Sequence, residues 1–123
     1  MTNTVLETEN LTKAYGNKEV LHPTSFSVVK GEILAVIGPS GAGKSTLLRL
    51  LDGLESPTAG TIRIFGEPFV RASRKKIRSR MGILFQKTVL FDRSVVDNIA
   101  LGLSYRRIPR AEQRRRHPCG HHR

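Results

Sequence analysis

The sequence predicts an α/β fold with a mixed sheet, in which antiparallel strands come first and a parallel core follows. Residues 5–11 and 61–65 alternate apolar and polar side chains, as half-buried strands do. The apolar run 33–37 leads through a glycine-rich loop into a helical pattern, and a second apolar run follows at 81–85. Such continuous apolar runs are typical of buried parallel strands. The strand–loop–helix unit is therefore expected at the centre of the sheet.

Turn residues separate the other elements. Tyr15-Gly16-Asn17-Lys18 and Lys30-Gly31-Glu32 are turn sequences, and so are the stretches 52–53 and 56–60. Between them the sequence predicts, in order, short strands at 20–21 and 25–29, a helix that ends near Leu51, a strand at 61–65 and an exposed basic helix at 71–80.

The glycine-rich loop, residues 38–45, matches the phosphate-binding pattern G-x-x-x-x-G-K-[ST] in full. Its backbone N–H groups and the N-terminus of the following helix can converge on an anion. Lys44 can reach the β- and γ-phosphates of a nucleotide, and Ser45 is placed to ligate Mg²⁺. A plain tight turn would not require Lys-Ser at these positions. The expected phosphate contacts are Gly38, Pro39, Ser40, Gly41, Ala42, Gly43, Lys44, Ser45 and Thr46.

Composition limits the other classes of function. No run of eighteen apolar residues could span a membrane, the N-terminus lacks secretory-signal features, and the single Cys119 excludes an internal disulfide. The net charge of +11 is uneven: residues 1–70 hold six basic and seven acidic side chains, and residues 71–123 hold fifteen and three. We expect a cytoplasmic protein with two electrostatic halves.

Three motifs in order closely resemble the ATPase subunit of ABC transporters. They are LTKAYG at 11–16, the phosphate loop, and MGILFQK at 81–87 followed by VDNI at 96–99. The resemblance covers about residues 5–116 and implies a P-loop NTPase fold of the ABC type. By this resemblance Tyr15 would stack on adenine, although packing against Leu11 is the alternative. Gln86 would be the Q-loop glutamine that contacts Mg²⁺ and the attacking water; ordinary loop polarity is the alternative.

The resemblance also implies partners and a location. The cofactors would be ATP and Mg²⁺, and the partners a membrane-spanning permease and a second ATPase subunit, with the chain peripheral on the inner face of the cell membrane. The short form and the segment 89–99 are similar to importers of small oxyanions or polar amino acids.

Several family motifs are missing from the sequence. No Ser-Gly-Gly occurs, and Asp92 follows the strand at 83–85 too closely to end a neighbouring parallel strand, which needs a crossover of about a dozen residues. Asp92 is therefore interpreted as part of the Q-loop. We expect residues 1–116 to be the N-terminal part of the domain, and 117–123 an atypical, disordered tail of a truncated chain. Such a chain would bind ATP with little or no hydrolysis.

Three other interpretations remain open. The loop could belong to a different phosphate-loop enzyme, such as a small kinase. The basic segments 71–80 and 106–116 could bind RNA or an anionic membrane surface, but no aromatic residues interleave with their charges, so no nucleic-acid partner is expected. Cys119 and the histidines of the tail could hold a metal, although they lack the paired spacing of a closed zinc site.

Overall fold

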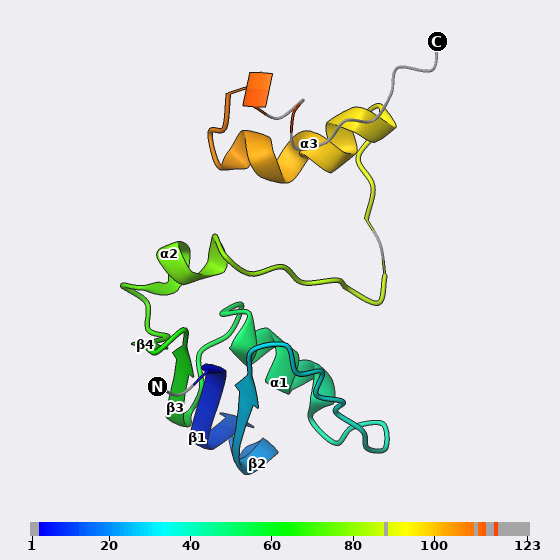
Figure 1. Ribbon diagram of the computed structural model, residues 1–123. Coiled ribbons are helices and arrows are strands. Elements are labelled where there is room, and N and C mark those ends of the chain that lie inside the picture. The colour runs from blue at the N-terminus through cyan, green and yellow to red at the C-terminus, as the bar shows by residue number, and fades with distance from the viewer. Residues whose placement is uncertain (1–2, 88, 110, 113–114, 116–123) are drawn as a thin grey trace. The chain divides into compact units, whose positions relative to one another are not determined.

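The computed structural model describes residues 3–87, 89–109, 111–112 and 115 of the chain (Figure 1). The chain divides into two compact units between Ile83 and Leu84. Within these described ranges, the first unit contains the sheet and two helices, and the second contains a longer helix. None of the helices in these described ranges is long and apolar enough to cross a membrane.

The sheet of the first unit has four strands in the order β2-β1-β3-β4, and every neighbouring pair is antiparallel. The strands are β1 (Thr4–Tyr15), β2 (Lys18–Val29), β3 (Ala59–Ile64) and β4 (Glu67–Pro68). Tyr15 pairs with Lys18 across the β1–β2 hairpin, which confirms the predicted turn. The two short strands expected at 20–21 and 25–29 are parts of one strand, β2. This strand lies at the edge of the sheet, where Pro23 is tolerated although it cannot donate a backbone hydrogen bond.

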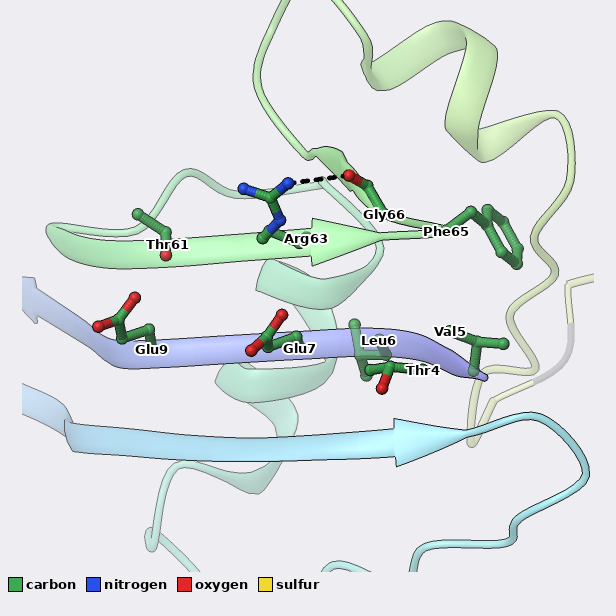
Figure 2. A pocket seen from close by; sticks show the side chains of 9 residues that line it. All are labelled: Thr4, Val5, Leu6, Glu7, Glu9, Thr61, Arg63, Phe65 and Gly66. Carbon is green, nitrogen blue, oxygen red and sulfur yellow. Dashed lines mark hydrogen bonds between the residues drawn. The ribbon is translucent and has the colours of Figure 1, made fainter. Parts of the chain in front are cut away.

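One helix covers the apolar face of the sheet. Helix α1 (Lys44–Leu51) buries Leu47 and Leu50, which are three residues apart and therefore on one face. They pack against apolar side chains of β1, β2 and β3, and Figure 2 shows α1 behind these strands. The core residues are Leu11, Leu21, Leu47, Leu50, Ile62, Ile64, Phe69 and Ile77.

The predicted parallel core is not present as strands in the described residues. The runs 33–37 and 81–85 have no strand assignment, and the side chains of Ile33 and Leu84 are 96% and 91% exposed. A buried parallel strand needs neighbours that supply its hydrogen bonds, and the four-stranded sheet offers these segments none. The basic segment 71–80 is also less helical than expected, since α2 spans only Arg74–Arg78 and buries only Ile77.

The second unit is built around α3 (Val95–Tyr105), the element that follows the predicted Q-loop. Ser94 caps this helix: its Oγ accepts a hydrogen bond from the Asp97 N–H (3.1 Å) and donates one to Asp97 Oδ2 (2.8 Å). Farther along, the Glu112 N–H donates to the Pro109 carbonyl (3.0 Å), as at a helix start. The predicted tail, 117–123, lies outside the described residues.

Candidate functional site

The loop between residue 37 and α1 has the backbone shape that its glycines allow. Gly41 and Gly43 have φ angles of +82° and +88°, in the left-handed region that side chains disfavour. A Cβ atom on Gly43 would lie 2.4 Å from the carbonyl oxygen of Val20 in β2. Gly43 therefore allows both the turn and the close approach of the loop to the sheet.

Lys44 folds back over this loop. Its Nζ donates hydrogen bonds to the carbonyl oxygens of Gly38 and Pro39, the latter at 2.6 Å. Among the described residues no carboxylate forms an ion pair with Lys44. In the part of the chain that the structure describes, its positive charge is therefore balanced by carbonyl dipoles and not by a carboxylate, and it can interact with an anion.

The start of α1 adds further donors. No side chain caps this helix, so its first N–H groups have no side-chain acceptor. Ser45 is exposed and Thr46 is half-buried, both in the first turn. The N–H groups without a side-chain cap, the positive end of the helix dipole and the Lys44 ammonium, which has no carboxylate partner in the described residues, together favour a bound polyanion.

Tyr15 ends β1 and is brought close to the first turns of α1. Its hydroxyl donates a hydrogen bond to Oε2 of Glu55, and the ammonium of Lys13 lies 5.0 Å from the centre of its ring. The ring is 48% exposed, whereas Leu11 is fully buried. These polar contacts and this exposure argue against the alternative that Tyr15 simply packs on Leu11.

The surroundings of Tyr15 raise the pKa of its hydroxyl above the ordinary value of 10.0. The main cause is the hydrogen bond to Glu55, followed by partial desolvation and the negative charge of Glu55; Arg49 and the Thr46 hydroxyl act in the opposite direction. Since the folded state favours the neutral phenol, its contribution to stability is complete below the unfolded pKa. That contribution is lost as the pH rises through the folded pKa.

The sequence did not reveal the residues that surround Tyr15. Glu55 lies 40 positions later, between the predicted turn sequences 52–53 and 56–60, where the sequence indicated no role for it. Lys13 gave a weak signal, because residues two apart on a strand share a face. Arg49 lies on α1, where its NH1 is 3.5 Å from Glu55 Oε1.

Gln86 belongs to the second unit, and its side chain is exposed. Asp92 is also exposed and lies in a loop, and its interpretation as part of the Q-loop stays a prediction. Asn98 binds this loop: it accepts from the Phe91 N–H (2.9 Å) and donates to the carbonyls of Phe91, Arg93 and Ser94 at 3.1, 3.2 and 3.0 Å. The contact of Gln86 with Mg²⁺ stays a prediction.

A cavity of about 630 Å³ lies elsewhere, over β1 and β3 (Figure 2). It is lined by Thr4, Val5, Leu6, Glu7, Glu9, Thr61, Arg63, Phe65 and Gly66. None of the predicted site residues is among them. Across the ranges given above, no group of three or more His, Cys, Asp or Glu residues could hold a metal ion, and Cys119 and the tail histidines fall outside those ranges.

A glycine loop that opens the helix packed on this sheet defines a P-loop NTPase domain. The profile of one family, described as ABC transporter, matches residues 21–119. The chain belongs to this family.

Two curated relatives and one solved structure show the extent of the likeness. A sulfate/thiosulfate import ATP-binding protein from Mesostigma viride is 46% identical over 81% of this chain and 28% of its own length. A methionine import ATP-binding protein from Corynebacterium diphtheriae is 41% identical over 94% and 36%. The structure of cbiO1 from Clostridium perfringens, part of the ABC transporter complex cbiONQ, has a TM-score of 0.79 and 30% identity over 93% and 47%. The chain thus spans about a third of the length of these curated relatives.

Proposed function

We propose that the chain is the ATP-binding component of an ABC import system that energises uptake of a small oxyanion or polar solute. The observation that carries the proposal is Lys44, whose ammonium has no carboxylate partner in the described residues and is held by the Gly38 and Pro39 carbonyls at the start of α1, a helix without a side-chain cap. The names of the sulfate/thiosulfate and methionine relatives support an import role.

Each predicted residue has a role in this proposal. The segment 38–46 holds the phosphates of ATP, and the Tyr15 ring stacks on the adenine. Ser45 fits a hard cation such as Mg²⁺, because its hydroxyl is an oxygen donor in the exposed first turn of α1. Gln86 is its second proposed contact. Mg²⁺ would neutralise phosphate charge when it is bound.

The partners are part of the same proposal. A membrane-spanning permease would contact the second unit, where the exposed apolar side chains Val89, Leu90 and Phe91 precede α3. A second ATPase subunit would complete the nucleotide site. The chain would then work at the cytoplasmic face of the cell membrane.

Titration calorimetry with Mg-ATP tests the nucleotide site. Lys44→Ala should weaken binding by about 1.5–3 kcal/mol, the usual contribution of a hydrogen bond to a charged group. Lys30→Ala removes an exposed lysine from a turn and serves as the control. Equal affinity of the wild type and Lys44→Ala would refute the assignment.

Phosphate release by the same proteins tests the hydrolysis step. We expect the 123-residue chain to release phosphate from ATP no faster than Lys44→Ala, because its sequence has no identified carboxylate base. Turnover that disappears in Asp92→Asn would show instead that Asp92 activates water.

A further inference from the structure

The carboxylate of Glu55 has a partner for each oxygen. Oε2 accepts the Tyr15 hydroxyl and lies 3.8 Å from Lys13 Nζ, while Oε1 lies 3.5 Å from Arg49 NH1. The side chains of Glu55 and Lys13 are only 23% and 16% exposed, so the pair is partly shielded from water. One carboxylate therefore joins the end of β1 to α1.

Backbone contacts hold this carboxylate in place. The segment after α1 runs along the end of β1, where the Thr58 N–H donates to the Thr12 carbonyl (2.9 Å) and the Ala14 N–H donates to Thr58 Oγ1 (2.9 Å). Lys13 Nζ also donates to the Ser56 carbonyl (2.8 Å). Backbone hydrogen bonds fix the segment that carries Glu55 to the end of β1, which carries Tyr15. The Glu55–Tyr15 hydrogen bond therefore limits the movement of the Tyr15 ring.

The restricted ring also stays accessible, since Tyr15 is 48% exposed. Its hydroxyl is anchored at Glu55, and the Lys13 ammonium lies over the ring. An aromatic ring at the end of a strand otherwise loses side-chain entropy when a base stacks on it. A ring that is already fixed loses less entropy when the base binds, so the stacking interaction contributes more to nucleotide affinity.

We propose that Glu55 is a positioning residue for the nucleotide base: it holds the Tyr15 ring beside the start of α1 and so sets how much the base adds to nucleotide affinity. The inference rests on the proposed nucleotide function, since Tyr15 is taken to stack on adenine. Glu55 touches neither the phosphates nor the base in this proposal; it acts through the Tyr15 hydroxyl.

A comparison of ATP with tripolyphosphate separates the two proposals, because tripolyphosphate has no base. Tyr15→Phe and Glu55→Ala should each lower ATP affinity about fivefold, the effect of one hydrogen bond. Tyr15→Phe should leave the affinity for tripolyphosphate unchanged. Glu55→Ala should change it only as much as the loss of one negative charge does. The double variant should bind ATP no more weakly than Glu55→Ala, because the Tyr15–Glu55 bond is already absent from that single variant. Glu9→Ala, which removes an exposed β1 carboxylate with no partner among the described residues, is the matched control.

The outcomes are distinct. If neither tripolyphosphate nor ATP binds to the wild type, the proposed nucleotide function is wrong. If tripolyphosphate binds and Tyr15→Phe keeps the full preference for ATP, the role of Glu55 is overturned while the nucleotide function stands. Additive losses in the double variant would also overturn it.

A second readout needs no nucleotide. The chain has two tyrosines and no tryptophan, so Tyr105→Phe leaves Tyr15 as the only source of tyrosinate absorbance. In this background Glu55→Gln should lower the pKa of Tyr15, because the amide keeps an acceptor but removes the negative charge. An identical titration curve in both proteins would show that Glu55 does not act on the Tyr15 hydroxyl.

Discussion

At the scale of single residues, Gly43 meets two constraints that one side chain would break. Its φ of +88° is unfavourable for other residues, and a Cβ atom would approach the Val20 carbonyl to 2.4 Å. Gly41 has a similar φ of +82° but nothing within 4 Å of its Cβ position. An alanine at position 41 would therefore introduce backbone strain alone, whereas an alanine at position 43 would introduce both strain and a steric clash.

Gly43→Ala should lower the free energy of unfolding by about 2–3 kcal/mol, while Gly41→Ala, with strain alone, should cost about 1 kcal/mol. Because the wild-type chain itself has little stability to lose, urea unfolding followed by circular dichroism measures both variants in the presence of a stabilising osmolyte such as sucrose. Gly43→Ala should also weaken ATP binding, because α1 starts at the displaced position. Equal losses for the two variants would show that the approach to Val20 carries no energy.

The residues of the loop could be predicted because they are contiguous in the sequence and each glycine, Lys44 and Ser45 has a chemical reason to be there. Glu55 could not be predicted in the same way. Its partners, Tyr15 and Arg49, come from a strand and a helix, and only the packed fold brings the three together. A carboxylate in a turn has no local signal for such a role.

At the scale of elements, the sequence correctly predicted the turns, helix and strands that depend on local residues. The β1–β2 turn, the helix from Lys44 to Leu51 and the alternating strand near 61–65 are all present, since turn residues and one-sided burial determine them. The apolar run 33–37 is not a strand in the described residues. Its apolar pattern predicts that the segment is buried. A strand also needs hydrogen-bonding neighbours from distant parts of the sequence, which the local pattern does not supply.

The side chain of Asn98 ties helix α3 to the preceding loop. In Asn98→Ala the Phe91 N–H loses its acceptor, so its hydrogen exchange should become at least about fivefold faster. Asn98→Asp keeps an oxygen acceptor and should retain most of the protection of Phe91. Nuclear magnetic resonance of exchanging amides measures this, and unchanged protection in Asn98→Ala would mean that the loop is held by other contacts.

At the scale of the whole molecule, the 123-residue chain exposes much apolar surface. Ile33, Ile37 and Leu84 are 96%, 91% and 91% exposed, and Val89 and Leu90 are also mostly exposed. The core cluster in the described residues has eight buried hydrophobic side chains. Folding must offset a conformational entropy of order 100 kcal/mol, so a small core leaves a net stability near zero.

We therefore expect the isolated chain to be poorly soluble or molten, with exposed apolar segments that promote association. Ile37→Lys should raise its solubility without loss of helical signal, because this side chain contributes almost no burial. Leu50→Lys changes a residue that is 1% exposed and should unfold α1, since a buried lysine without a partner is unfavourable. Dye binding to exposed apolar surface and dispersion of amide resonances measure the state of each protein. A sharp, reversible thermal transition of monomeric wild-type chain, with dispersed amide signals, would contradict the expectation and would mean that 33–37 and 81–91 find partners within these residues.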